Sequence, residues 1–282
     1  MREELRISWV KLLLVLVALL LIPAALLFFR QHSMIYYPRA YAATYQRMLL
    51  PGTQELEYTT PAGKQVAFYL PARSGAAMPA RVWVAFSGNA SVALDWLDVV
   101  ARNPNESDAF LLLDYPGYGK SEGRASIASS RASADQAIST LAERLNVSEA
   151  EISARLCVMG VSLGAAAALE FAAGHPVQRA VLIAPFTTLR EVAAQLFTRP
   201  ASYLLLESYD NRSRIRELAQ RSPAPRIAIF HGTDDTLIPL RMGQELAQAA
   251  GDAAQFFPVQ SANHDTVVGY ALDEIIAWMN RP

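Results

Sequence analysis

The stretch that most constrains the fold of this chain runs from residue 156 to residue 173. It starts with the apolar segment Leu-Cys-Val-Met-Gly-Val, passes through a Gly-x-Ser-x-Gly pattern centred on Ser162, and ends in an alanine-rich run. A buried strand, a sharp turn and a small-residue helix in this order form a nucleophile elbow, whose turn lifts a serine hydroxyl clear of a sheet. Gly160 and Gly164 let the strand and the helix pass close together. Ser162 is therefore the candidate nucleophile.

Short apolar segments alternate with helical patterns along the rest of the chain. The predicted strands are 55–59, 65–70, 81–86, 109–114, 156–161, 179–184, 226–230 and 254–259, and the clearest helices are 92–102, 126–145 and 265–279, the last capped by Asp265. Continuous apolar strands separated by helices indicate a parallel sheet covered on both faces. The first two strands flank Thr60-Pro61-Ala62-Gly63, which predicts a hairpin and an antiparallel edge. We expect an α/β fold with an eight-stranded, mostly parallel sheet.

The segment between the sixth and seventh predicted strands is long for a crossover. It runs from Phe186 to Ala224 and contains apolar runs at 192–197 and 203–206. We interpret it as one crossover helix plus a small helical cap, at about residues 187–224, over the ends of the strands. An insertion at this place commonly forms the roof of a substrate pocket.

The N-terminus contains eighteen residues, Leu12 to Phe29, without a polar side chain. At a rise of 1.5 Å per residue they form about 27 Å of helix, close to the hydrocarbon thickness of a bilayer. Trp9 precedes the run, and Tyr36 and Tyr37 follow it as interfacial aromatic residues often do. The alternatives are a cleaved signal peptide, which lacks a clear cleavage site here, and a buried core helix.

We interpret this run as a transmembrane signal anchor. The expected organisation is a tail at 1–11, the anchor at 12–30, a juxtamembrane connector at 31–51, whose segment 34–38 docks on the domain, and the catalytic domain at 52–282. Basic residues flank both sides of the anchor about equally. Because a short basic N-terminal tail usually stays in the cytoplasm, we expect the large domain on the periplasmic or extracellular side.

The composition excludes several classes of function. The net charge of −1 at pH 7 provides no basic face for nucleic acid. One cysteine permits neither an internal disulfide nor a thiolate metal cluster. Neither a His-x-x-x-His spacing, nor a carboxylate cluster, nor a glycine-rich phosphate loop is evident, so we expect no metal and no cofactor. The sequence does not indicate an oligomeric state.

A serine nucleophile needs a base to accept its proton and an acid to orient that base. In an elbow architecture with the chain order Ser, acid, His, the acid follows the seventh strand and the histidine follows the eighth. The loop after 254–259 contains His264, whereas the loop after 226–230 contains both Asp234 and Asp235. The chemistry alone does not choose between these two aspartates.

Several motifs together resemble the α/β-hydrolase superfamily across nearly the whole soluble part. Within it, the chain is similar to the membrane-anchored serine hydrolases of the bud-emergence type and their depalmitoylase-like relatives. They share the run Asp-Tyr-x-Gly-Tyr-Gly-x-Ser-x-Gly, present here at 114–123, and His-Gly-x-x-Asp-x-x-Val/Ile-Pro, present at 231–239. The aspartate of the second motif falls on Asp235, so the resemblance favours Asp235 over Asp234.

An oxyanion hole requires two backbone N–H groups that point at the developing charge. Leu163, the residue after the nucleophile, would provide one of them. The resemblance implies that Asn89 provides the other, since the family usually has His-Gly-Asn-Ala where this chain has residues 87–90, with Ser87 in place of the histidine. Asp114 and Ser121 could form a second acid and nucleophile, but a loop-stabilising role is the simpler interpretation.

These observations predict a single-pass, membrane-anchored serine hydrolase. Ser162, His264 and Asp235 would act on a small-molecule or lipid-like substrate, with an apolar ester or thioester favoured. Peptide amides are an alternative substrate class, because related hydrolases include peptidases. A catalytically silent partner-binding protein with the same fold is a second alternative.

Overall fold

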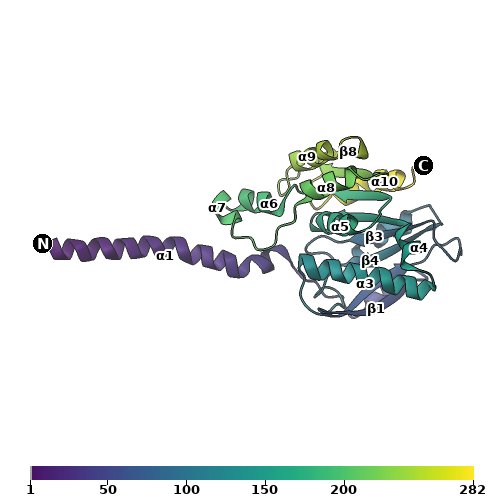
Figure 1. Ribbon diagram of the computed structural model, residues 1–282, viewed down its shortest axis with the longest axis horizontal. Helices are drawn as coiled ribbons and strands as arrows, with labels where there is room; N and C mark the ends of the chain where they lie inside the picture. Colours follow the sequence, from purple (N-terminus) through teal and green to yellow (C-terminus); the bar gives the residue numbers. More distant parts are fainter. Residues whose placement is uncertain (1) are drawn as a thin grey trace.

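The protein is built around one eight-stranded sheet, shown in Figure 1. The computed structural model describes the backbone of residues 2–282 and the side chains of residues 9–19 and 21–282. The strands are β1 (Gln54–Thr60), β2 (Gly63–Leu70), β3 (Arg81–Phe86), β4 (Asp108–Leu113), β5 (Leu156–Val161), β6 (Arg179–Ile183), β7 (Arg226–Gly232) and β8 (Ala254–Val259). Their spatial order is β1-β2-β4-β3-β5-β6-β7-β8. Because the strands from β4 to β8 in this order are parallel, the carboxyl ends of β3, β5, β7 and β8 lie at the same edge of the sheet.

Strand β2 alone runs against the others. It pairs antiparallel with β1, from Thr60 opposite Gly63 to Gln54 opposite Tyr69, and antiparallel with β4 on its other side. Every pair from β4 to β8 is parallel. The predicted hairpin and the mostly parallel sheet are both confirmed.

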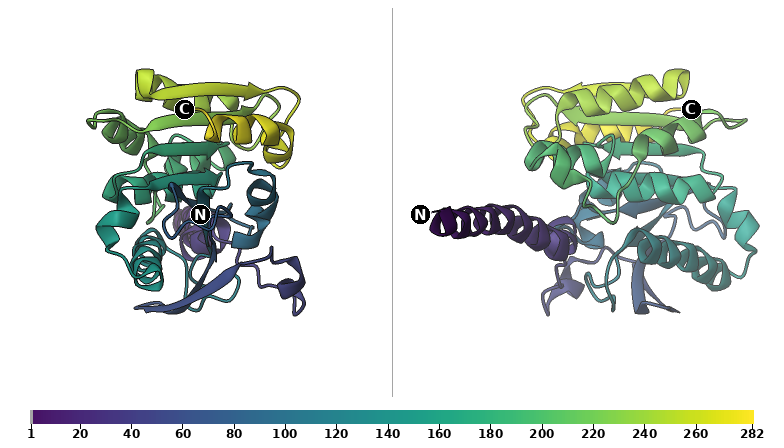
Figure 2. Two further views of the ribbon diagram at one scale, coloured as in Figure 1. Left: turned by 90° about the vertical axis from the view of Figure 1, so that its right-hand side faces the viewer. Right: turned by 60° about the vertical axis from the view of Figure 1, so that its left-hand side comes forward.

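Helices cover both faces of the sheet, as Figure 2 shows. The helices are α1 (Arg2–Ile35), α2 (Leu97–Arg102), α3 (Ile127–Leu145), α4 (Glu149–Ser153), α5 (Leu163–Gly174), α6 (Leu189–Leu196), α7 (Arg199–Ser202), α8 (Asn211–Ala219), α9 (Leu240–Ala250) and α10 (Val267–Met279). Alternate strand residues enter two cores, because successive side chains of a strand point to opposite faces. Val84 and Val158 pack with α3, α5, α8 and α9, whereas Trp83 and Cys157 pack with α2 and α10.

Two of the predicted helices begin differently from the expectation. The predicted helix at 92–102 is a 3₁₀ turn, Ala93–Trp96, followed by the short helix α2. The prediction that Asp265 caps the last helix is wrong, because α10 begins at Val267 after Thr266. The Asn263 side chain accepts hydrogen bonds from the N–H groups of Asp265 and Thr266, which holds the preceding residues in a turn.

The N-terminal helix α1 projects from the domain, as Figure 1 shows, and extends beyond the predicted anchor in both directions. Its portion Trp9–Ile35 contains an 18-residue window with a mean hydropathy of 3.1 and is long and apolar enough to cross a membrane. Its last turns dock on the domain. Tyr36 is only 2% exposed, and its hydroxyl donates a hydrogen bond to Glu207 Oε2 at 3.2 Å. Tyr36 is therefore packed on the domain, as expected for the docking segment 34–38, and is not the interfacial aromatic residue that its place after the apolar run suggested.

The segment between β6 and β7 contains three helices. Helix α8 packs against α5 and α9 as the crossover helix, whereas α6 and α7 form a small cap at the carboxyl edge of the sheet. Thr188 caps α6 and Thr198 caps α7 through hydrogen bonds from backbone N–H groups. The cap lies on the side from which α1 projects (Figure 1).

Candidate active site

Ser162 occupies a strained turn between β5 and α5. Its φ of 56° and ψ of −118° are unusual for a residue with a side chain and cost about 1–3 kcal/mol. The turn is held by a hydrogen bond from Ser162 N–H to the Ile183 carbonyl at 2.8 Å. A Cβ at Gly160 would collide with the Gly164 carbonyl oxygen, and one at Gly164 with the Phe86 carbonyl oxygen. Gly160 is therefore needed for the close approach of β5 to α5, and Gly164 for the close approach of α5 to the end of β3.

Three side chains from separate loops form one chain of hydrogen bonds. The Ser162 hydroxyl lies 2.9 Å from His264 Nε2, and His264 Nδ1 lies 2.8 Å from Asp235 Oδ2. When Nδ1 carries the proton and donates to Asp235, Nε2 is free to accept from the serine hydroxyl. This arrangement can move a proton from the serine to the imidazole and stabilise the resulting positive charge.

The environment of Asp235 separates it from its neighbour Asp234. Asp235 is 6% exposed, and its Oδ1 accepts hydrogen bonds from the N–H groups of Leu237 and Ile238 at 3.0 and 2.8 Å. Asp234 is exposed, and its carboxylate accepts from the Thr233 hydroxyl. Of the two aspartates that the sequence left open, Asp235 is the one that contacts His264.

His231 supports this loop from the interior. Its Nε2 donates a hydrogen bond to the Ile238 carbonyl at 2.7 Å and lies 3.6 Å from Asp235 Oδ2. Burial lowers the pKa of His231, so the ring is neutral at pH 7. His231 therefore fixes the far end of the loop that carries Asp235 without adding a charge beside it.

The loop after β3 lies opposite the serine and is braced by tyrosines. The Tyr115 hydroxyl donates to the Ser87 carbonyl at 2.8 Å, and the Tyr118 hydroxyl donates to the Asn89 carbonyl at 2.6 Å. The N–H of Tyr37, just beyond α1, donates to the same Asn89 carbonyl at 3.0 Å. Leu163 is the first residue of α5, so its amide has no acceptor within the helix.

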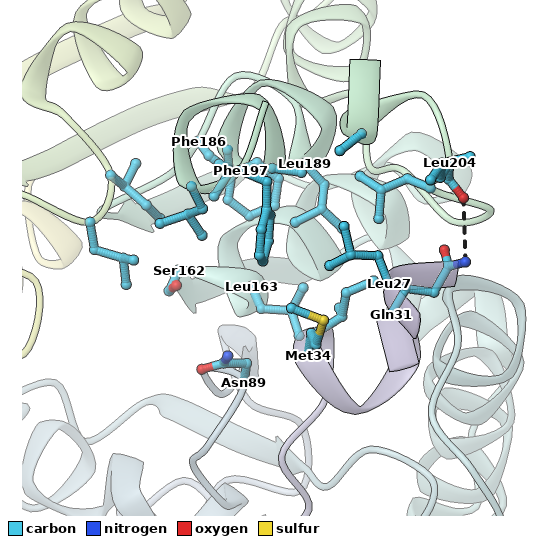
Figure 3. Close-up of a pocket in the computed structure, with 18 of the residues that line it drawn as sticks. Leu27, Gln31, Met34, Asn89, Ser162, Leu163, Phe186, Leu189, Phe197 and Leu204 are labelled. Atoms are coloured by element: carbon cyan, nitrogen blue, oxygen red, sulfur yellow. Dashed lines mark hydrogen bonds between the residues drawn. The ribbon is translucent and has the colours of Figure 1, made fainter. Parts of the chain in front are cut away.

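An apolar pocket leads away from Ser162, as Figure 3 shows. It has a volume of about 340 Å³, within the usual range for a small-molecule site. Its walls come from α1, the loop after β3, the start of α5, the α6–α7 cap and the loop after β7: Leu27, Gln31, Met34, Ile35, Tyr37, Asn89, Ser162, Leu163, Phe186, Leu189, Val192, Ala193, Leu196, Phe197, Ala201, Leu204, Leu205, Leu237 and Ile238. Ser162 and Asn89 lie at one end of this pocket, and Leu27, Gln31 and Leu204 lie at the other (Figure 3).

The comparisons with known proteins agree with this architecture. The sequence model of the alpha/beta hydrolase family matches residues 74–280. The chain belongs to the alpha/beta hydrolase family. It is 30% identical over 238 residues to the Mycobacterium tuberculosis protein Rv2307c, which covers 84% of this chain and 81% of the relative. It is 27% identical over 218 residues to Escherichia coli YfhR, and the match covers 75% of this chain and 73% of YfhR.

Solved structures share the fold of this hydrolase. The Pyrococcus furiosus esterase Pf2001 superimposes with a TM-score of 0.63 at 16% identity, covering 87% of this chain and 95% of the esterase. The hydrolase GrgF from Penicillium gives a TM-score of 0.60 at 16% identity, and the superposition covers 82% of this chain and 96% of GrgF. At these identities the likeness extends to the fold and not to a substrate.

The run at 114–123 of this alpha/beta hydrolase has a structural role. Asp114 accepts hydrogen bonds from the Ala93 N–H and the Tyr41 hydroxyl, both at 2.8 Å, and Ser121 Oγ accepts from the Val66 N–H at 3.1 Å. Neither residue lines the pocket. The sequence signalled a stabilised loop here, but only the structure shows that its two tyrosines brace the loop around Asn89.

Sequence reasoning missed the part that α1 plays in the site. Leu27, Gln31 and Met34 of this helix line the pocket, although they lie in or beside the stretch expected to be an anchor. Their spacing of four and three residues places them on one helix face. The apolar character of the whole run concealed this signal, because a membrane span and a pocket wall demand the same residue types.

Proposed function

We propose that this protein is a membrane-anchored serine hydrolase that cleaves carboxylic esters or thioesters through an acyl-enzyme. The observation that carries the proposal is the hydrogen-bonded chain from Ser162 through His264 to Asp235 at the head of an apolar pocket. Such a chain activates a hydroxyl that is otherwise a weak nucleophile at neutral pH.

The reaction would proceed in two halves. Ser162 Oγ attacks the acyl carbonyl while His264 Nε2 takes the serine proton and Asp235 stabilises the imidazolium. The amides of Leu163 and Asn89 hold the oxyanion, and each such donor contributes about 3–4 kcal/mol to the transition state. The leaving alcohol or thiol receives the proton from His264. A water molecule, deprotonated by His264, then releases the acid and restores the free serine.

The pocket supports an apolar acyl group. Apart from Gln31, Tyr37, Asn89 and Ser162, the residues that line it have apolar side chains. Burial of each CH₂ group in such surroundings contributes about 0.8 kcal/mol to binding. We therefore favour esters and thioesters of apolar acids over peptide amides.

A fluorophosphonate probe tests the proposal, because it reacts covalently with an activated serine. We expect the wild-type protein to be labelled and the Ser162→Ala variant to remain unlabelled. Ser121→Ala is the matched control, since Ser121 hydrogen-bonds the Val66 N–H outside the pocket, and it should label like the wild type. A folded wild-type protein that resists labelling would instead favour the silent, partner-binding alternative.

We also propose that α1 anchors the protein with its catalytic domain on the periplasmic or extracellular side. The length and hydropathy of Trp9–Ile35 support the anchor, and the basic residues Arg2, Arg6 and Lys11 before the apolar run support the orientation. Protease treatment of sealed vesicles tests the orientation. We expect protease outside right-side-out vesicles to digest the domain, and its complete protection there would reverse the assignment.

A further inference from the structure

The last turns of α1 form the far end of the pocket that starts at Ser162. Leu27, Gln31 and Met34 share one face of the helix and line this pocket (Figure 3). Their side chains are partly buried, whereas the neighbouring Leu26 is 58% exposed. The anchor candidate and the acyl pocket of the proposed hydrolase therefore share one helix.

The Gln31 side chain joins α1 to the cap. Its Nε2 donates to the Leu204 carbonyl at 3.3 Å, and its Oε1 accepts from the Leu206 N–H at 2.7 Å. One amide thus pairs with both polar groups of a backbone segment, as a neighbouring strand would. This pairing holds the α6–α7 cap beside α1 at the end of the pocket distant from the serine.

The position of this contact along α1 sets its depth in a membrane. A hydrocarbon core of about 30 Å requires about 20 helical residues. Lys11 is the last charged residue before the apolar run, so a span that starts at Leu12 reaches about as far as Gln31. Leu27 then lies inside the hydrocarbon, and the distal end of the pocket lies at its boundary.

The cap presents an apolar edge at the same level. Leu196, Phe197, Tyr203 and Leu206 are 53%, 45%, 73% and 72% exposed. Figure 1 shows α6 and α7 projecting from the domain in the direction of α1, toward the region that a bilayer around α1 would occupy. Clustered apolar side chains of this kind mark a membrane or protein contact. Because α1 fixes a bilayer at this level, the bilayer is the occupant that we assign to this edge.

We propose that the enzyme draws its substrate directly from the bilayer. The acyl chain of a membrane lipid ester lies between α1 and the α6–α7 cap, with its ester at Ser162, so the anchor helix is also a wall of the acyl site. This inference rests on the proposed hydrolase function. It assigns long-chain lipid esters as the substrate class. The substrate would enter the pocket from the membrane leaflet that faces the domain.

Chain-length selectivity tests the acyl wall. The full chain is placed in phosphatidylcholine vesicles with 4-methylumbelliferyl butyrate or palmitate, which share a leaving group. Leu27→Trp narrows the pocket, and we expect the palmitate-to-butyrate ratio of kcat/KM to fall about tenfold. Leu26→Trp, on the exposed face of the same helix, is the matched control and should keep the wild-type ratio.

The outcomes separate the inference from the function on which it rests. Equal ratios in the two variants, or a wild-type enzyme that cleaves butyrate but not palmitate, would overturn the inference and leave the hydrolase standing. A wild type that cleaves neither ester and resists the fluorophosphonate probe would overturn both.

The depth of the cap provides a second, activity-independent test. Cys157 is fully buried, so an introduced cysteine can be labelled selectively with an environment-sensitive NBD dye. At Leu206→Cys we expect quenching of the dye by nitroxide-bearing lipids. At Ala76→Cys, in the exposed loop at the opposite edge of the sheet, we expect none. Equal quenching at both sites would refute the membrane contact of the cap.

Discussion

Adjacent carboxylates can have different roles when their surroundings differ. Asp234 and Asp235 are equivalent in chemistry and one residue apart, so the sequence required a family motif to choose between them. In the structure, Asp235 is buried and receives two backbone N–H groups, whereas Asp234 is exposed. The choice depends on the path of the loop after β7, which local sequence does not determine.

This difference predicts unequal effects of the two amide substitutions. Asp235→Asn should lower kcat by about 10⁴-fold, because the amide stabilises the wrong tautomer of His264 and cannot balance its charge. Asp234→Asn should change kcat by less than about twofold. Steady-state hydrolysis of 4-methylumbelliferyl butyrate measures both, and similar losses in the two variants would contradict the assignment of Asp235.

His231 predicts a specific loss of stability in acid. Burial lowers the pKa of His231 in the folded state. As the pH falls below the unfolded value of about 6.5, the unfolded chain therefore binds a proton at His231 more readily than the folded protein does, which favours unfolding. Above pH 6.5 both states hold a neutral ring and the effect vanishes. The free energy of unfolding should therefore fall as the pH decreases from 6.5 to 5.

Urea unfolding of the full chain in detergent micelles measures this slope. His231→Asn should be less stable than the wild type at pH 7.5 by about 1 kcal/mol, because the hydrogen bond to Ile238 is weakened. Its stability should nevertheless depend less on pH between 6.5 and 5. Parallel pH profiles in the two proteins would show that another group causes the acid sensitivity.

At the level of elements, the run at 114–123 has hydrogen-bond partners that its sequence motif does not predict. Its glycines and aromatic residues predicted a stabilised loop, and Asp114 and Ser121 do serve that purpose. The partners of Tyr115 and Tyr118 are carbonyls 28 and 29 residues earlier in the chain. Such contacts follow from the pairing of β3 with β4 and could not be read from the motif alone.

The tyrosine brace predicts a functional effect without unfolding. Tyr115→Phe removes the donor to the Ser87 carbonyl, so the loop that carries Asn89 loses a restraint. We expect kcat/KM to fall about tenfold and the stability to fall by about 1–3 kcal/mol.

Tyr58→Phe is the matched control. It removes a buried hydroxyl that lies 3.0 Å from Ser133 Oγ, between β1 and α3. It should lower stability to a similar extent while kcat/KM stays at the wild-type value. Equal activity losses in the two variants would show that Tyr115 acts through general stability alone.

The start of α10 shows why helix ends were harder to predict than helices. Asn263, Asp265 and Thr266 are all residues that favour caps, and their order did not reveal which one takes the backbone N–H groups. Asn263 takes those of Asp265 and Thr266 and keeps His264 in a turn rather than in a helix. The helix itself was predicted from residue 265 to residue 279 and is present as α10, because a periodic apolar pattern indicates a helix more directly than it indicates where the helix begins.

For the whole molecule, the sheet followed from the sequence pattern, whereas the contribution of α1 to the pocket did not. Eight apolar segments separated by helices indicate a sheet with helices on both faces, whichever apolar residues the segments contain. The pocket depends on contacts such as Gln31 to Leu204, separated by 173 residues. An apolar N-terminal run predicted a membrane span but carried no signal that its end would meet the cap.

The Gln31 contact predicts that α1 restrains local opening of the cap. Gln31→Leu removes both hydrogen bonds, so the amide of Leu206 should exchange with solvent about tenfold faster. Hydrogen exchange with mass spectrometry measures this rate. Ser33→Ala, which removes a bond within α1 to the Arg30 carbonyl, is the control and should leave the rate unchanged. Unchanged exchange in the Gln31 variant would show that other contacts hold the cap.

The proposed mechanism requires that Ser162 forms a covalent acyl-enzyme at the head of the pocket. Acid quenching during turnover of 4-methylumbelliferyl butyrate, followed by peptide mass mapping, detects this intermediate. We expect a butyryl group on the peptide that contains Ser162, and none in the Ser162→Ala variant. Rapid turnover with an acyl group on a different residue, or undiminished turnover by Ser162→Ala, would contradict it.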